Sequence, residues 1–177
     1  MSIEFDDHAL GEYERNLIRV RDGLDNQFKK MVKKAASLVL EKAVKTTNTS
    51  DALKNEQGQT VRVGGTLRRG WTADSESEAE SGSQRGVSEY VAKAKVVVDG
   101  KEYSLDITNP VHYASYVEYG HRQEVGRFVP AIGKRLKKPW VEGQFILTNA
   151  MKSTNNKFGR VMEKQLQDYL TKELGDD

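Results

Sequence analysis

The chain has 177 residues, of which 37% are hydrophobic and 31% charged, and its 28 Lys and Arg side chains nearly balance 26 Asp and Glu. This length suffices for one domain with its own core, and the near-neutral charge argues against a protein dedicated to binding polyanions. The absence of cysteine excludes disulfides, zinc fingers, iron–sulfur clusters and cysteine nucleophiles. No apolar run approaches the ~20 residues that span a bilayer, and residues 1–14 lack a secretory pattern, so we expect a soluble intracellular protein.

Two helices are expected at the N-terminus. Asp6 or Asp7 can cap a first helix, which Gly23 interrupts. A second helix should run from about Leu24 to Val44, because apolar side chains recur there at helical spacing. The apolar stripe of this second helix comprises Leu24, Phe28, Met31, Ala35 and Leu38, widened by Val32, Val39 and Ala43.

Two segments carry too few apolar residues to fold alone. Residues 46–66 are rich in Thr, Asn, Ser, Gln and Gly, and they are longer than an ordinary connection. Residues 74–86 are acidic and rich in serine, and they lack the fixed ligand register of a calcium loop. Neither segment can bury enough apolar surface to offset its ordering entropy, so both are expected to be flexible loops, either mobile or ordered by a partner.

The middle of the chain predicts antiparallel strands. Residues 87–98 alternate between the two faces of a strand, and Asp99-Gly100 signals a two-residue hairpin. The return strand places Tyr103, Leu105 and Ile107 on one face and Glu102, Ser104 and Asp106 on the other. A preceding strand is expected over residues 67–73. A small antiparallel sheet should therefore pack one face on the long helix.

Residues 109–122 have the pattern of a short helix with signals at both ends. Asn109 can cap the helix, Pro110 suits its first position, and Gly120 suits the left-handed position after its last turn. The face at i, i+3, i+4 spacing comprises Tyr113, Tyr116 and Val117. Several tyrosine side chains on about two helical turns favour a protein-binding surface over a catalytic site, because tyrosine offers a large contact area at little cost in rotamer entropy.

The C-terminal part is expected to be helical. Apolar residues recur from Phe145 to Leu170. A break or bend is expected near the polar cluster Ser153 to Asn156 and at Gly159, because neither favours a helix interior.

Positive charge is concentrated in one stretch. Residues 120–140 carry six Lys or Arg against one Glu, whereas residues 47–119 carry eight Lys or Arg against eleven Asp or Glu. A compact basic segment beside an acidic body indicates an oriented contact with an acidic partner. That partner can be a neighbouring subunit or a nucleic acid.

Patterns typical of catalysis and of metal binding are weak. His112 and His121 lie nine residues apart, not at the i, i+4 spacing of a zinc pair. The stretch Gly64-Gly65-Thr66 lacks the length and the lysine of a phosphate loop. Carboxylate pairs such as Glu78 and Glu80 fall in an expected loop, which would hold no geometry for acid–base chemistry. We therefore expect no catalytic, metal or cofactor site.

Nucleic-acid binding is the stronger competitor. Arg62, Arg68, Arg69 and the cluster at 122–138 could meet phosphates, and Phe128 and Trp140 could stack on bases. Against this, no helix suited to reading a groove is evident, and the overall charge is near balance.

Three separated segments resemble one known family. Residues 65–71, Gly-Thr-Leu-Arg-Arg-Gly-Trp, resemble a Thr-Gly-x-Leu-Arg-x-Ser signature, with Gly-Gly-Thr in place of Thr-Gly. Residues 113–121 resemble a Tyr-Ala-x-Tyr-Val-Glu-x-Gly-Thr signature, with His121 in place of threonine. Residues 128–130 and 143–147 resemble a Pro-x-Pro-Phe segment before a last helix. Together with the N-terminal helix, they resemble the tail-component or head–tail joining family of long-tailed bacteriophages and prophage elements, over roughly residues 24–152.

The resemblance implies a virion structural protein without catalysis or a cofactor. Such a subunit would form a homo-oligomeric ring, often a hexamer, at the neck, where it completes the tail. The ring would join the tail tube or tail terminator protein to the head connector or adaptor, and DNA would pass through it without sequence-specific binding. It would be assembled in the host cytoplasm, with no membrane contact and no small-molecule substrate. The alternatives are a minor tail or base-plate component and a basic DNA-binding accessory protein.

The expected architecture is a single α+β domain over residues 1–177. It comprises the family-like core at 24–152, the two flexible loops and a C-terminal helical extension at 153–177. A head-to-tail ring needs two complementary patches on each subunit. We expect contacts with neighbouring subunits at Tyr113, Tyr116, Val117, Tyr119, Arg122, Arg127, Phe128, Lys134, Arg135, Lys137, Lys138, Trp140, Arg68 and Arg69.

Overall fold

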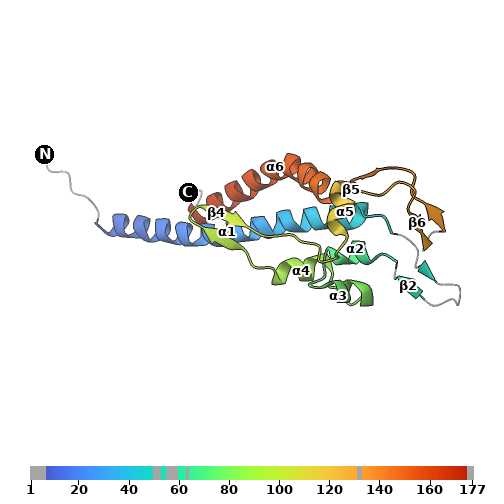
Figure 1. The fold of residues 1–177 in the computed structure, drawn as a ribbon. Coiled ribbons are helices and arrows are strands. Elements are labelled where there is room, and N and C mark those ends of the chain that lie inside the picture. The colour runs from blue at the N-terminus through green and yellow to red at the C-terminus, as the bar shows by residue number, and fades with distance from the viewer. Residues whose placement is uncertain (1–6, 50–52, 55–59, 63, 131–132, 175–177) are drawn as a thin grey trace.

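The computed structural model describes residues 7–49, 53–54, 60–62, 64–130 and 133–174. The protein is an elongated α+β fold in which a long N-terminal helix, α1 (Asp7–Thr46), runs beside a C-terminal helix, α6 (Ile146–Leu174), as Figure 1 shows. The predicted fold class is confirmed. Within the described residues the strands form four separate antiparallel pairs, so the predicted small antiparallel sheet is present as two-stranded pairs rather than as one larger sheet.

The two helices predicted on either side of Gly23 form one continuous helix, α1. A Cβ atom on Gly23 would collide with the hydroxyl of Tyr169 on α6, and this hydroxyl donates a hydrogen bond to the Val20 carbonyl at 3.4 Å. Close packing of α6 thus offsets the ~1 kcal/mol that glycine costs inside a helix, and the predicted interruption is wrong. Of the two predicted caps, Asp7 is already helical and Asp6 lies outside the described residues.

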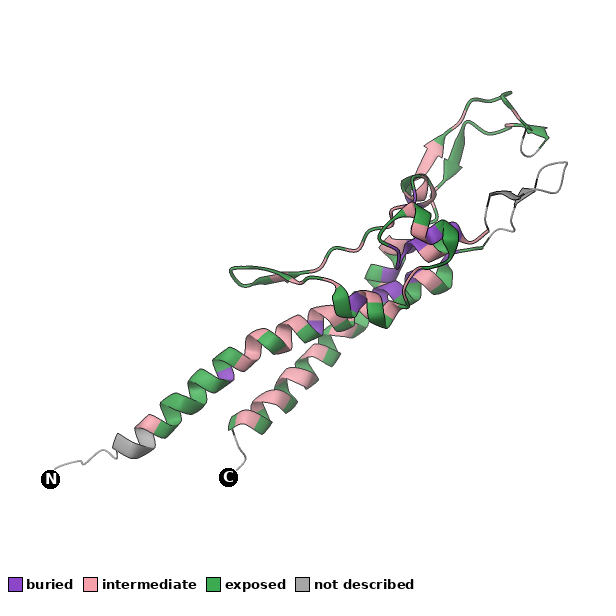
Figure 2. Ribbon diagram, turned by 90° about the horizontal axis from the view of Figure 1, so that it is seen from below, coloured by how far each residue is buried: buried purple, intermediate pink, exposed green. Residues whose placement is uncertain are grey.

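The main core lies where α6 and the small helices cover the C-terminal half of α1 (Figure 2). Its α1 side chains include Val39, Leu40 and Ala43, and Leu40 is fully buried. The other buried members are Ala36, Trp71, Val91, Ile146 and Ala150. Leu40 stands outside the predicted stripe, whereas Leu38, inside it, is 38% exposed. The buried face is therefore turned relative to the predicted one.

Helix α2 (Thr66–Gly70) replaces the strand predicted over residues 67–73. Its C-terminal neighbour Trp71 is buried in the core, and the indole Nε1 donates a hydrogen bond to the Thr47 hydroxyl at 2.7 Å. The Thr47 hydroxyl itself donates to the Ala43 carbonyl at 2.7 Å. This chain of bonds fixes α2 to the end of α1, so the strand prediction is wrong.

Helix α3 (Glu76–Ser81) forms inside the segment predicted as a flexible loop at 74–86, and the loop prediction is wrong over that helix. The hydroxyl of Ser75 accepts a hydrogen bond from the Glu78 amide at 3.2 Å, and Gly82 ends the helix at φ 78°. Ser75-x-x-Glu78 matches the Ser-x-x-Glu capping pattern, a signal that predicts a helix start.

Helix α4 (Val87–Lys93) occupies most of the strand predicted over residues 87–98, which is therefore wrong there. Val87, Tyr90 and Val91 lie at i, i+3, i+4 spacing and pack on the main core. The strand begins only at β3 (Val97–Asp99), which pairs with β4 (Glu102–Ser104). The predicted hairpin is confirmed, with its turn at residues 100–101.

The β3–β4 hairpin docks on α1 through Tyr103. The Tyr103 ring lies 5.3 Å from the Phe28 ring, and its hydroxyl donates to Asp25 Oδ1 at 3.0 Å. Lys29 Nζ donates to Asp25 Oδ2 at 2.6 Å. The hydrogen bond from Lys29 has the larger effect in holding the pKa of Asp25 below its ordinary value, and the hydrogen bond from Tyr103 adds to it. We call Asp25, Lys29 and Tyr103 the Asp25 cluster.

Helix α5 (Ala114–Tyr119) is shorter than the helix predicted from Asn109, and Tyr113 stands at its N-cap. Asn109 instead ties the preceding turn to α2, because its side chain accepts from the Val111 amide at 3.2 Å and donates to the Leu67 carbonyl at 2.9 Å. The predicted start at Asn109 and Pro110 is therefore wrong. The predicted end is confirmed, since Gly120 follows the last helical residue, but its φ of 83° and ψ of 173° lie outside the left-handed helical region that was predicted.

Helix α6 is continuous through Ser153–Asn156 and Gly159, so the predicted break is wrong, whereas Figure 1 shows that the axis of α6 bends, as the other form of that prediction allows. Thr154 is buried against α1, while the other polar side chains of the cluster lie on more accessible parts of the helix. Packing along α1 thus overrides the weak helix propensity of this stretch. The helix of the C-terminal extension predicted at 153–177 is continuous with the preceding residues, because α6 begins at Ile146.

Strands β1 (Leu53–Lys54) and β2 (Thr60–Arg62) pair within the segment predicted as a flexible loop at 46–66. Residues 50–52, 55–59 and 63 of this segment lie outside the described residues, so its flexibility stays a prediction.

Candidate assembly interface

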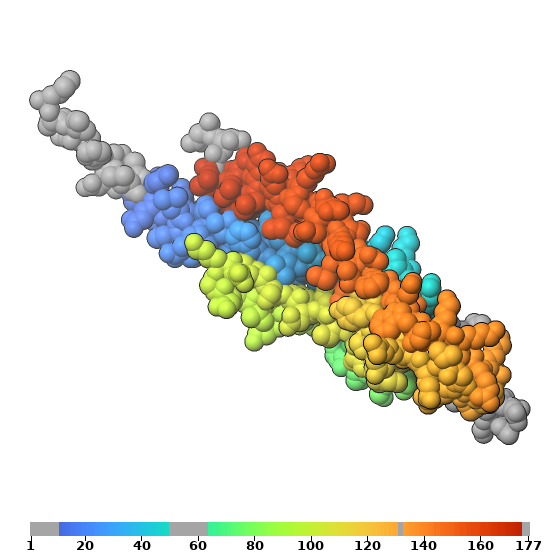
Figure 3. Space-filling model, turned by 45° about the horizontal axis from the view of Figure 1, so that its top comes forward, coloured from blue at the N-terminus to red at the C-terminus, as the bar shows by residue number. Residues whose placement is uncertain are grey.

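A narrow ribbon projects from the end of the molecule where α5 lies. Strand β5 (Gly120–Arg122) pairs with β8 (Trp140–Glu142), and β6 (Phe128–Val129) pairs with β7 (Lys134–Arg135). We call residues 120–142 the arm, of which 131–132 fall outside the described part. Figure 3 shows the arm at the opposite end of the molecule from the start of α1.

Backbone hydrogen bonds connect the two strand pairs of the arm. Gly126 N donates to Leu136 O at 2.9 Å, and Leu136 N donates to Arg127 O at 2.9 Å. The Arg135 guanidinium donates to Gly126 O at 2.7 Å. The described part of the arm is therefore a continuous hydrogen-bonded ribbon rather than an irregular loop.

The arm exposes large apolar side chains together with its cations. The exposed fraction is 57% for Val125, 50% for Phe128 and 45% for Trp140. The six predicted cations are all exposed, namely Arg122, Arg127, Lys134, Arg135, Lys137 and Lys138. A two-stranded ribbon has no core on which such side chains could pack. Aromatic residues mixed with arginine on an exposed surface are typical of protein–protein contacts.

The base of the arm is fixed by the carboxylate of Glu118, which is only 7% exposed. Its two oxygens accept hydrogen bonds from Leu147 N at 3.0 Å, Thr148 N at 2.9 Å and the Thr148 hydroxyl at 2.8 Å. These amides belong to the first turn of α6, where backbone N–H groups lack helical partners and a negative charge is favourable. Glu118 thus caps α6 from a distant point in the chain.

Two glycines bring the start and the end of the arm together. A Cβ on Gly120 would lie 2.8 Å from Gly143 N, and a Cβ on Gly143 would collide with the Glu118 carbonyl. Phe145 N donates to that carbonyl at 3.1 Å. Only glycine permits this approach, since Gly120 also has the positive φ that other residues avoid.

The residues of the tyrosine face predicted on α5 fall into two groups in the structure, one packed inside the subunit and one exposed. Tyr113 packs beside a small cluster of buried residues, and Val117 packs on the main core. Tyr116 and Tyr119 are 56% and 63% exposed, and the Tyr116 ring lies 5.6 Å from His121. The contact role of these residues stays a prediction, and the two exposed tyrosines are the members that a partner can reach.

The predicted contact residues on α2 also differ in exposure. Arg68 is exposed, whereas Arg69 turns inward and donates to the Ala79 carbonyl at 2.5 Å and to the Gly64 carbonyl at 2.9 Å. Arg69 thus connects α2 to α3 within the subunit. Its contact role, like that of Arg68, remains untested.

Sequence reasoning missed Arg85, which lies between α3 and α4. Its guanidinium pairs with Asp74, and this pairing raises the Arg85 pKa. The same group sits 5.5 Å from the centre of the Tyr90 ring. With Arg68 and Arg69 it lines a hollow of about 370 Å³. No local pattern marked this residue, because its partners meet only after α3 and α4 form.

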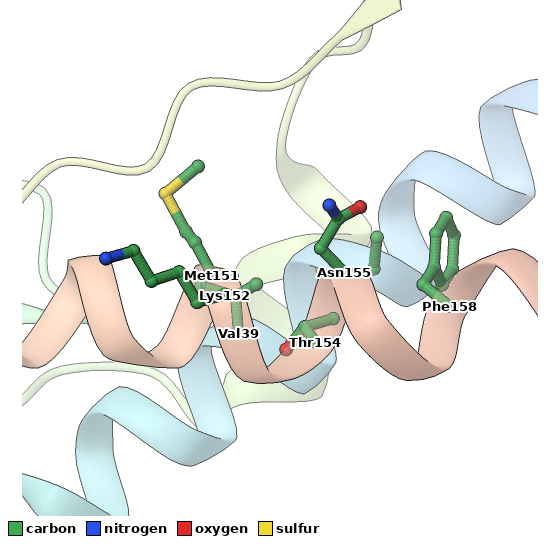
Figure 4. Close-up of a pocket in the computed structure, with 7 residues that line it drawn as sticks. Val39, Met151, Lys152, Thr154, Asn155 and Phe158 are labelled. Atoms are coloured by element: carbon green, nitrogen blue, oxygen red, sulfur yellow. The ribbon is translucent and has the colours of Figure 1, made fainter.

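A second hollow, of about 340 Å³, lies between α1 and α6 (Figure 4). Val39 comes from α1, and Met151, Thr154 and Phe158 come from α6. Met151 is 55% exposed, so the hollow opens to the surface. Its apolar lining suits a hydrophobic side chain of a partner rather than a charged group.

Polar groups with catalytic potential are scattered. His112 Nδ1 lies 2.6 Å from Glu76 Oε1 at the surface, whereas the His121 ring lies beside Tyr116. Among the described residues, no three His, Asp or Glu side chains gather as a metal site would require. No described helix contains an apolar stretch long enough to cross a membrane.

Comparison with known proteins gives one match. A family model described as bacteriophage HK97-gp10, putative tail-component, matches residues 12–120. No curated protein and no solved structure matches the chain. The matched range contains most of α1, the small helices, the β3–β4 hairpin and Glu118, and it ends where the arm begins, before α6. A family of phage tail components implies a place in the virion and contact with other virion proteins. Because the match covers more than half of its residues, the chain belongs to the HK97-gp10-like family of bacteriophage tail components.

Proposed function

We propose that this protein is a non-catalytic subunit of the phage neck that completes the tail and joins the tail tube to the head connector. The observation that carries the proposal is the arm, a basic and aromatic ribbon fixed on the Glu118 cap and exposed along its length. Family membership supports a tail component in general. A junction protein must in addition bind several different neighbours, and a projecting arm gives it a contact surface separate from its core.

Two surfaces of opposite charge support a homo-oligomeric ring, for which six copies is the number that the resemblance to the family implies. Residues 120–142 carry six Lys or Arg against two Glu, whereas residues 74–106 carry eight Asp or Glu against four Lys or Arg. In the ring, the arm of one subunit lies on the acidic surface of the next, which satisfies the need of a head-to-tail contact for two different patches. Phe128 and Trp140 supply the apolar anchors, and the cations set orientation.

The place in the particle is tested by deleting the gene in the phage or prophage that encodes it. Loss of a junction subunit should yield full heads and complete tails that remain separate in electron micrographs. A minor tail or base-plate role would instead yield absent, defective or incomplete tails. Normal joined particles, or a particle map in which the neck lacks this chain, would refute the proposal.

The arm is tested separately with the double variant Phe128→Ala and Trp140→Ala. Both side chains are about half exposed, so the variant should fold normally by circular dichroism but fail to restore joining in the deletion strain. Val97→Ala is the matched control, since Val97 is an apolar residue, 49% exposed, on the distant β3–β4 hairpin. Restoration of joining by the double variant would exclude the arm as a contact.

DNA binding is a second candidate, because exposed aromatics among cations also suit single-stranded nucleic acid. In the junction model, DNA passes through the ring without being read, and purified protein should bind it weakly at 0.15 M salt. Micromolar or tighter binding with a steep salt dependence would favour the DNA-binding alternative.

A further inference from the structure

The start of α1 extends past the end of α6. Near the end of α6, the hydroxyl of Tyr169 reaches the Val20 carbonyl and packs on Gly23. Residues 12–19, which precede this contact, are all exposed in the described structure. Figure 2 shows this part of α1 projecting beyond α6.

The projecting segment bears apolar side chains that no other described element covers. Tyr13 is 62% exposed, Leu17 45% and Ile18 44%. The sequence also repeats apolar residues every seven positions, at Leu10, Leu17, Leu24, Met31 and Leu38. A seven-residue apolar repeat is the pattern of helices that pair side by side. Most helical stability in proteins comes from packing of such a face, so an uncovered stretch of about two turns indicates a missing partner helix.

The charges on the segment identify the partner. Glu12 and Glu14 precede Arg15, Arg19 and Arg21, so the segment is acidic at its start and basic toward its end, where the exposed Arg21 also pairs with Asp22 at 2.9 Å. Two copies in parallel and in register would place like charges beside each other. Two antiparallel copies would place the acidic half of each beside the basic half of the other, which is favourable.

We infer that residues 10–21 of α1 pair antiparallel with the same residues of a second copy of this chain. Glu14 and Arg21 occupy the same position of the seven-residue repeat and face each other twice across the two-fold axis, which lies near Leu17. The paired segment is only about 18 Å long, so its interface is smaller than the ~1,200 Å² of stable complexes and the pairing is reversible.

A two-fold contact cannot be one of the rotational contacts within a ring. It therefore links a subunit to a copy outside its own ring, or two subunits before a ring forms. This inference does not depend on the proposed place at the head–tail junction.

The test is the concentration dependence of the mass of the full chain in sedimentation velocity. The wild type should show monomer and dimer, or rings and pairs of rings. Leu17→Glu should raise the dissociation constant of the pair at least about tenfold and leave the mass of any ring unchanged. Val97→Glu, at a similarly exposed apolar residue, should have no effect. Loss of rings with pairs retained would count against the ring and not against this pairing.

Charge exchange and crosslinking test the orientation. Glu14→Arg and Arg21→Glu should each weaken pairing, and the double exchange should restore it. The chain has no cysteine, so single cysteines can be introduced without background. Leu17→Cys should form a disulfide-linked dimer on mild oxidation, whereas Tyr13→Cys, away from the two-fold axis, should not. Equal crosslinking at both positions, or wild-type protein that shows no pairing at all, would overturn the inference.

Discussion

Replacing Glu118 by alanine should destabilise the protein more than any other single change in the arm region. The substitution removes three hydrogen bonds from a carboxylate that is only 7% exposed, and it leaves the amides of Leu147 and Thr148 without partners. A hydrogen bond to a charged group contributes about 1.5–3 kcal/mol, and loss of a helix cap costs ~1 kcal/mol. Bonds to one carboxylate are not additive, so we expect a loss of about 3 kcal/mol.

Thermal unfolding followed by circular dichroism measures this loss. For a chain of this size, 1 kcal/mol corresponds to about 2–4 °C, so Glu118→Ala should lower the Tm by about 6–12 °C. Amide hydrogen exchange at Leu147 and Thr148 should accelerate. The matched control is Glu124→Ala, because Glu124 is an exposed carboxylate of the arm, and its Tm should stay within about 2 °C of the wild type. A Tm for Glu118→Ala equal to that of the control would refute the cap.

Three further predictions follow from the fold. Gly120→Ala should lower the Tm by several degrees in the same assay, because φ 83° is strained for alanine and a Cβ would press on the backbone of Gly143. Trp71→Phe should cost about 1–3 kcal/mol in urea unfolding, since it removes the bond to Thr47 from a buried site. Because the folded state lowers the pKa of Asp25, the Asp25 cluster stabilises the protein at pH values above 3.8, the ordinary pKa of this carboxyl. The stabilisation is lost as the pH falls through the lower pKa of the folded state. The Tm difference between the wild type and Asp25→Asn should therefore shrink from pH 6 to pH 3.

The long helices and the hairpin could be predicted because their signals are local and repeated. The apolar stripe of α1 extends over many turns, and Asp99-Gly100 is a strong turn signal. The short helices were missed for a physical reason. In seven residues such as Val87–Lys93, helical and alternating spacings both place apolar side chains on one face, and contact with the main core decides between them.

The candidate interface was predictable in part. The cluster of cations from Arg122 to Lys138 indicated an exposed basic segment, and the structure places all of its charged groups at the surface. The helical spacing placed Tyr113 and Tyr116 on one face of α5, but it does not indicate which of the two side chains packs against the core. Glu118 was missed because the amides that it binds lie some thirty residues later in the chain.

The family match ends where the arm begins, and it also leaves out α6, to which the arm is fixed. The matched range ends at Gly120, the first residue of the arm, and it includes the Glu118 carboxylate that fixes the arm to α6. The match therefore covers the carboxylate of the cap, whereas the amides that it binds on α6 and the cations and exposed aromatics of the arm lie beyond it. A surface ribbon can change in length and sequence at little cost to a core that it does not enter. In the contact role that we propose for the arm, its exchange between family members should transfer partner preference without altering the subunit fold.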